Sequence, residues 1–159
     1  MEDGKIEDRK LTPHQARLKA ESYCAYQERS QQEVRNKLYD WGLFGEDVED
    51  IIAQLIADNF LNEERFAKAF VSGRFKLKGW GKIKIKQHLK AKKISEPLIR
   101  IALREIDDHD YEQKLNHLLH QKVNKPISDL TLPEKAKLVR YLQSKGFENE
   151  LIFEKISNG

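Results

Sequence analysis

The chain has 159 residues, of which 39% are hydrophobic and 35% are charged, with one cysteine and a formal net charge of +3. This hydrophobic fraction can build a core and excludes a disordered chain, and the single cysteine excludes an internal disulfide and zinc sites made from paired cysteines. Because no run approaches the roughly 18 to 20 apolar residues that span a bilayer, we expect a soluble, cytoplasmic protein that binds no membrane.

The composition predicts an all-α protein, since four Pro and eight Gly are too few for the frequent turns of a sandwich or barrel. Residues 1–11 alternate acidic and basic side chains with nothing to bury, so we expect a flexible arm there. The first helix is predicted over 13–28. Thr12, Pro13 and Gln15 mark its start, with a capping hydroxyl, an early-turn proline and a reciprocal glutamine.

Two further helices are predicted before residue 60. Ser30 and Glu33 form a second capping box ahead of apolar residues at helical spacing, which indicates a helix over 31–41. A strongly amphipathic pattern then predicts a third helix over 46–58. Residues 12–59 therefore form a three-helix unit.

The apolar pattern of this unit recurs twice along the chain. The aligned positions are Val34, Leu38, Leu43, Val48 and Ile52, then Ile85, Leu89, Ile94, Ile99 and Leu103, then Leu138, Leu142, Phe147, Ile152 and Ile156. Gly42, which can end a helix in the left-handed conformation, aligns with Lys93 and Gly146. Since each three-helix unit buries little alone, we infer three tandem repeats that share apolar surface in an elongated, curved helical body.

The alignment gives boundaries for every element. The repeats occupy 12–59, 60–107 and 108–159, and the third has a long internal loop near 124–132. The remaining helices are predicted over 63–77, 81–92 and 96–106, and over 109–123, 133–145 and 148–157. Asn62, Ser95 and Asn149 are predicted helix caps.

Residues 82–86 alternate lysine and isoleucine, as a half-buried strand would. A lone strand would have no partner in this chain. Ile85 and Leu89 also match core positions in the other two repeats. We therefore predict a helix here, with Ile83 partly exposed.

Charge is distributed unevenly along the chain. Residues 65–95 contain eleven lysines and arginines and no acidic residue, which leaves 18 basic against 26 acidic residues elsewhere. A concentrated positive surface attracts a polyanion or a carboxylate-rich partner, and such association weakens with salt. This acid-free segment therefore indicates binding before catalysis.

Two features of the acid-free segment are candidates for binding. Two glycines are expected to expose the backbone around Trp80, whose indole could stack on a base or fill an apolar pocket. The alternative is that Trp80 packs on its own repeat. Lys82, Lys86, Lys90 and Lys93 lie along one stripe of the following helix, where like charges repel unless a partner neutralises them. The alternative there is a soluble lysine-rich surface.

Other candidate sites are weaker. His117 and His120 lie one turn apart with nothing to complete a metal site, and the acidic cluster at 107–110 fits a helix N-terminus better than a ligand set. Cys24 is expected to be packed rather than nucleophilic. No phosphate loop, nucleophile elbow, kinase signature or zinc-protease motif is present. We expect no metal, no cofactor and no enzymatic activity.

Several motifs together resemble a known family. Residues 59–67 read Asn, Phe, Leu, Asn, Glu, Glu, Arg, Phe, Ala, and they precede a pattern of Arg74, Gly79, Gly81, Lys82, Ile83 and Leu89. The first repeat contributes Tyr26, Arg29, Ser30, Val34, Lys37 and Leu38. These residues resemble the RecX family of bacterial regulators. The chain departs from it at Asn59 and Lys93, where glycine is common, and in a third repeat that matches only in its apolar frame.

The resemblance implies a regulator that binds the RecA filament on DNA and usually inhibits its ATP hydrolysis, strand exchange and co-protease activity, with roles in DNA repair, recombination and the SOS response. We further expect weak, nonspecific binding of single- and double-stranded DNA by a monomer. The residues expected to bind RecA or DNA are Arg65, Arg74, Lys76, Lys78, Trp80, Lys82, Lys84, Lys86 and Lys90. Arg65 is equally placed to bridge Glu63 or an adjacent repeat. A second hypothesis is a sequence-nonspecific DNA-binding module that affects recombination indirectly, and an enzyme is a distant third.

Overall fold

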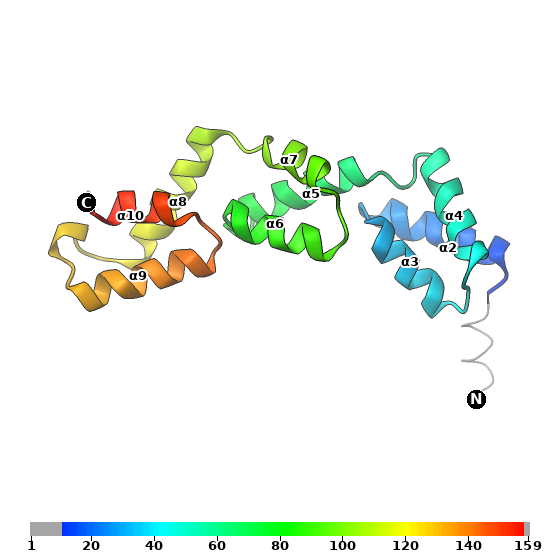
Figure 1. The fold of residues 1–159 in the computed structure, drawn as a ribbon, viewed down its shortest axis with the longest axis horizontal. Helices are drawn as coiled ribbons and strands as arrows, with labels where there is room; N and C mark the ends of the chain where they lie inside the picture. Colours follow the sequence, from blue (N-terminus) through cyan, green and yellow to red (C-terminus); the bar gives the residue numbers. More distant parts are fainter. Residues whose placement is uncertain (1–10, 158–159) are drawn as a thin grey trace, which may run out of the picture. The chain divides into compact units, whose positions relative to one another are not determined.

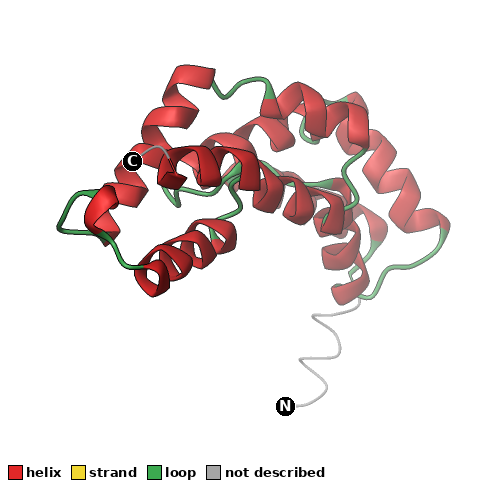
Figure 2. Ribbon diagram, turned by 60° about the vertical axis from the view of Figure 1, so that its left-hand side comes forward, coloured by secondary structure: helices red, strands yellow, loops and turns green. Residues whose placement is uncertain are grey.

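The computed structural model describes residues 11–157, which form helices and turns without a strand in that range (Figures 1 and 2). Its α-helices are α2 (Pro13–Tyr26), α3 (Gln31–Asp40), α4 (Glu46–Ala57), α5 (Glu63–Lys76), α6 (Lys82–Ala91), α7 (Glu96–Leu103), α8 (Asp108–Lys122), α9 (Leu132–Ser144) and α10 (Asn149–Ser157). The all-α prediction is confirmed, with three successive three-helix repeats. The alternating residues 82–86 belong to helix α6, and Ile83 is 43% exposed as expected.

The chain folds as two compact units. Unit one runs to Ala69 and includes Lys92–Ile94, and unit two comprises Phe70–Ala91 and the residues from Ser95 onward. The second and third repeats therefore share unit two over most of their length. None of the helices within 11–157 has the length and apolar character needed to cross a membrane.

The repeat alignment predicts the core correctly. All fifteen aligned positions are buried except Leu103, which is half-buried. Leu103 is the last residue of helix α7, and the preceding residue, Ala102, is the fully buried one at this end of the helix. Cys24 is also buried, as expected, and its burial raises the pKa of the thiol to about 11.

The turns after the second helices share one backbone conformation. Gly42, Lys93 and Gly146 have φ angles of 90°, 66° and 95°, so their alignment reflects a common left-handed residue. Asn59, after α4, adopts the same region with φ 66°. A lysine at this conformation lacks the side-chain bonds that ease asparagine into it.

Several predicted helix starts are confirmed. Thr12 with Gln15 and Ser30 with Glu33 form complete capping boxes. Asn62 accepts a bond from the Arg65 N–H at 2.9 Å.

Other starts differ from the prediction. Ser95 precedes α7 but its side chain caps nothing, and Asn149 is the first residue of α10 and accepts from Gln143 instead. Thr131 forms a capping box with Glu134 that the sequence analysis missed. The long loop of the third repeat lies between α8 and α9 and contains a short 3-10 helix, Ile127–Asp129.

The predicted arm over 1–11 lies outside the described residues, apart from Leu11. The prediction is wrong for Leu11, whose N–H donates to the Trp41 backbone oxygen at 3.1 Å. Its side chain packs against the core of unit one. Leu11 therefore belongs with the packed first repeat and not with an arm.

Candidate partner-binding surface

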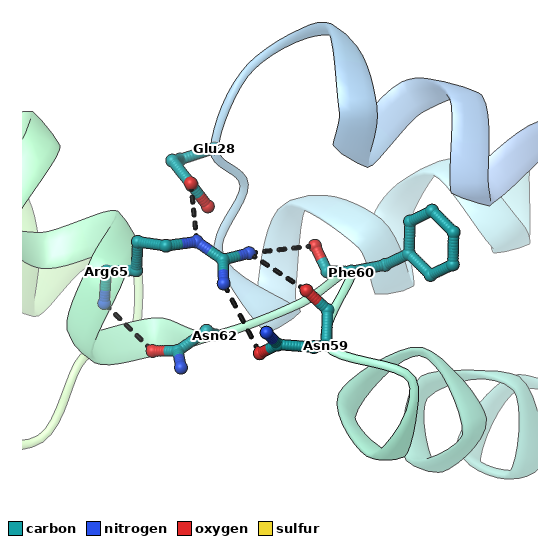
Figure 3. A network of polar contacts seen from close by, with 5 residues as sticks. All are labelled: Glu28, Asn59, Phe60, Asn62 and Arg65. Carbon is teal, nitrogen blue, oxygen red and sulfur yellow. Dashed lines mark hydrogen bonds and ion pairs between the residues drawn. The ribbon is translucent and has the colours of Figure 1, made fainter.

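Arg65, at the start of α5, is bound within unit one (Figure 3). Its Nε donates to a carboxylate oxygen of Glu28 at 2.5 Å, and its terminal nitrogens donate to three oxygens of Asn59 and Phe60 at 3.2 to 3.4 Å. The guanidinium thus fastens α5 to the loop after α2 and to the turn after α4. These contacts support the structural role considered for Arg65, with Glu28 as its carboxylate partner rather than Glu63.

Trp80 packs on its own repeat, which is the simpler of the two predicted arrangements. Its half-buried indole lies 4.5 Å from the ring of His88 and 6.4 Å from that of Phe70, measured between centroids. The Arg74 guanidinium carbon lies 5.4 Å from the indole centroid, and Lys84 Nζ lies 4.6 Å from it. Both cations are within the range of cation–π attraction.

The glycines on either side of Trp80 do not expose the backbone, and that expectation is wrong. Gly79 and Gly81 are both buried. The Gly79 N–H donates to the Phe75 oxygen at 3.1 Å, and the Gly81 N–H donates to the Lys145 backbone oxygen at 2.7 Å. The turn is closed because the third repeat packs against it.

The third repeat also caps the start of helix α6. The first amides of a helix have no acceptor within it. In this chain the Lys82 N–H donates to the Tyr111 hydroxyl at 2.8 Å, and the Ile83 N–H donates to the Gly146 oxygen at 3.0 Å. The Tyr111 hydroxyl in turn donates to Glu148 at 2.5 Å. The N-terminus of α6 is therefore occupied by protein groups.

The stripe of lysines on α6 is partly neutralised within the chain. Lys86 and Lys90 lie 3.1 and 3.8 Å from one carboxylate oxygen of Glu96, at the start of α7. This contact holds the pKa of Glu96 below its ordinary value. Lys82 Nζ lies 4.6 Å from the Tyr111 ring centroid. Glu96 thus relieves the repulsion between Lys86 and Lys90, so these two lysines do not require an external anion.

A different set of lysines lacks acidic partners. Lys78 and Lys84 of the second repeat and Lys114, Lys122 and Lys145 of the third form no ion pair with any carboxylate in the part of the chain that the structure describes. We call these five the junction lysines. Partial burial, followed by repulsion from the other four, lowers the pKa of the Lys145 ammonium. Each of the other four charges therefore acts on Lys145.

The predicted site residues thus separate into groups. Arg65 belongs to unit one and the other eight to unit two, where Arg74, Trp80 and Lys84 are brought together, Lys86 and Lys90 pair with Glu96, and Lys76 and Lys78 are exposed. The sequence analysis missed Lys114, Lys122 and Lys145, because acidic residues are interspersed with lysines in the third repeat. The sequence contains one indirect indication of Lys145: the alignment of Gly42 with Gly146 places Lys145 at a helix end.

Comparison with known proteins finds family matches in all three repeats. Three models of one family, described as the first, second and third three-helix domains of RecX, match residues 16–55, 62–103 and 109–156. Among curated relatives, Regulatory protein RecX of Lactobacillus johnsonii is 30% identical over 148 residues, covering 92% of this chain and 54% of that protein. Regulatory protein RecX of Cronobacter sakazakii is 33% identical over 105 residues, covering 66% of this chain and 62% of that protein.

The fold comparison agrees. The crystal structure of RecX from Lactobacillus salivarius superposes with a TM-score of 0.79 at 23% identity, covering 92% of this chain and 97% of that one. The chain spans about half the length of several of the curated relatives it matches. The three domain matches occur in the family's order, and each lies within one of the three repeats. The chain belongs to the RecX family of regulatory proteins.

Proposed function

We propose that this chain is a cytoplasmic regulator, not an enzyme, that binds the RecA–DNA filament and modulates RecA, usually by inhibiting ATP hydrolysis, strand exchange and co-protease activity. The observation that carries the proposal is the succession of three RecX three-helix domains over residues 16–156. The lysine-rich second repeat supports it, because a positive surface complements an acidic protein groove and nearby phosphates.

The exposed turn after α5 is the strongest candidate for the protein contact. Leu77 is 86% exposed, and the exposed Lys76 and Lys78 flank it. An apolar side chain among cations is suited to enter a pocket in an acidic surface, as an anchor residue does at a protein interface. Arg74, Trp80, Lys82 and Lys84 lie near this turn in the sequence and complete the proposed surface for RecA or DNA. We propose that the protein acts as a monomer.

The experiment is a titration of the protein into RecA on single-stranded DNA, with ATP hydrolysis as the readout. We expect inhibition at concentrations well below those that coat the DNA. Leu77→Ser should weaken inhibition, whereas Leu132→Ser, which changes a leucine that is 82% exposed in the third repeat, should not. Inhibition only at DNA-coating concentrations would contradict the proposal.

A second candidate function is a nonspecific DNA-binding module that affects recombination indirectly. The junction lysines favour it, because their charges lack carboxylate partners among the described residues. The two functions differ in the ATPase titration. A DNA-coating protein inhibits ATP hydrolysis only in proportion to the DNA it covers. Unrelated basic proteins should then inhibit to the same extent at equal coverage.

A further inference from the structure

The junction lysines come from two repeats that the backbone joins closely. Gly81 of the second repeat donates to the Lys145 oxygen, and the Gly146 oxygen accepts from Ile83. These bonds fix the end of α9 against the start of α6. They also place Lys145, at that end, beside Lys78 and Lys84.

Three of the junction ammoniums are held on backbone oxygens, two at helix ends and one in the turn after α5. Lys145 Nζ donates to the Lys78 oxygen at 2.7 Å, Lys84 Nζ to the Ser144 oxygen at 3.3 Å, and Lys114 Nζ to the Lys76 oxygen at 3.3 Å. Helix C-termini carry partial negative charge and attract cations. Because an ammonium has three N–H donors, each of these lysines retains donors for a ligand.

The other two junction lysines have fewer contacts. Lys122 Nζ lies 4.3 Å from the Tyr141 ring centroid, and the Lys78 side chain is exposed. An anion beside these charges would relieve the repulsion that contributes to the lowered pKa of Lys145. The start of α6 offers no alternative anion site, because the N–H groups of Gly81, Lys82 and Ile83 already donate to the third repeat.

The composition of the surface favours phosphate over carboxylate. All five cations are lysines, and lysine is depleted at protein–protein interfaces but is a common phosphate ligand.

We infer that Lys78, Lys84, Lys114, Lys122 and Lys145 form one phosphate-contacting surface that holds the DNA backbone, and that the third repeat supplies three of its five charges. The inference rests on the proposed function only in naming the DNA of the filament as the ligand. It moves the DNA contact away from the stripe on α6 and onto the junction of two repeats.

The test uses the full chain, a fluorescent oligothymidylate and no RecA, with binding measured by anisotropy at several salt concentrations. The variant Lys78→Gln/Lys122→Gln changes one lysine from each repeat, and neither side chain donates a hydrogen bond among the described contacts. The control Lys125→Gln/Lys155→Gln removes the same charge from two lysines of the third repeat that pair with Glu134 and Glu112.

Each phosphate contact contributes about 0.7 to the slope of log affinity against log salt for single strands. We expect the junction variant to reduce the slope by about 1 to 1.5 and the control to leave it nearly unchanged. Equal losses in both variants, an unchanged slope in the junction variant, or no binding by the unmodified chain at low salt would each overturn the inference. So would equal competition by polyglutamate, which would show a carboxylate-binding surface.

Lys145→Gln adds a second measurement. It removes an ammonium that the other four repel and should lower both affinity and slope, and a thermal melt reports whether the repeats remain joined. The RecA ATPase titration keeps the two proposals distinguishable. Inhibition without DNA binding would overturn this inference alone, and junction-dependent DNA binding without inhibition below DNA-coating concentrations would overturn the proposed function alone.

Discussion

Gly81 and Gly146 meet backbone to backbone. A Cβ built on Gly81 would lie 2.4 Å from the carbonyl carbon and oxygen of Gly146, and one built on Gly146 would lie 2.3 Å from the Cβ of Lys84. Neither position has room for a side chain unless the backbone shifts. This contact, with the hydrogen bonds around it, joins the second and third repeats.

Replacing Gly146 with alanine should destabilise unit two. The new Cβ overlaps the Lys84 backbone, and φ of 95° disfavours any side chain, so we expect a loss of about 2 to 4 kcal/mol in the free energy of unfolding. Gly73→Ala is the matched control, because its Cβ would contact nothing within 4 Å inside helix α5. That variant should gain about 0.5 to 1 kcal/mol. Urea denaturation measures both, and similar midpoints for the two variants would contradict the prediction.

Removing the Tyr111 hydroxyl should weaken the same junction. The hydroxyl accepts from the Lys82 N–H and donates to Glu148, so Tyr111→Phe leaves two polar groups without this partner. A cost of about 1 to 2 kcal/mol is expected. Denaturation monitored by circular dichroism measures it, and an unaltered midpoint would show that water replaces the hydroxyl without cost.

The same tyrosine should influence stability at alkaline pH. Burial, then the hydrogen bond to Glu148, raises the pKa of Tyr111 far above its ordinary value. An unfolded tyrosine loses its proton near pH 10. Above about pH 10 the unfolded chain therefore binds fewer protons than the folded chain, and the free energy of unfolding falls as pH rises. Tyr111→Phe should show a shallower fall, and parallel pH profiles for the two proteins would refute this assignment.

Replacing Arg65 with lysine should not be conservative. An ammonium cannot reproduce the bonds from one guanidinium to Glu28, Asn59 and Phe60. Because the site is partly exposed, the expected loss is only about 1 kcal/mol. The salt slope of DNA binding should stay unchanged. A lower slope with intact stability would instead place Arg65 on DNA.

Substitution by glycine should change stability in opposite directions at Lys93 and Asn59, two non-glycine residues with positive φ. Lys93 has φ 66° and no group suited to that conformation, so Lys93→Gly should gain about 0.5 kcal/mol. Asn59 has the same φ, but its side-chain oxygen accepts from Arg65, so Asn59→Gly should lose stability. Thermal melts of the two variants test this contrast, which fails if both shift in the same direction.

The repeats could be predicted from sequence because their signals are local. The apolar spacing of residues such as Ile85 and Leu89 depends on helix geometry alone, and it outweighed the alternation at 82–86. Capping boxes are equally local, since Ser30 and Glu33 lie within one helical turn. Ser95 resembles a cap in sequence, but its hydroxyl is not used.

The candidate surface was predicted less completely because its contacts are distant in sequence. The acid-free segment ends at Ser95, one residue before Glu96, so a linear reading could not show that Lys86 and Lys90 are paired. The closeness of Gly81 to Gly146 depends on two backbones meeting, which side-chain periodicity does not encode. Lys114 and Lys145 could not be predicted for the same reason. They are distant in sequence from Lys78 and Lys84 and approach them only in the folded chain.

The way helix α6 is capped has a consequence for synthesis on the ribosome. The amides of Lys82 and Ile83, and that of Gly81 just before the helix, donate to Tyr111, Gly146 and Lys145, which are translated well after α6 itself. The basic helix therefore lacks these acceptors while the third repeat is still being made. Until then these amides have only water to bond, and completion of the third repeat supplies the protein acceptors at the start of this lysine-rich helix.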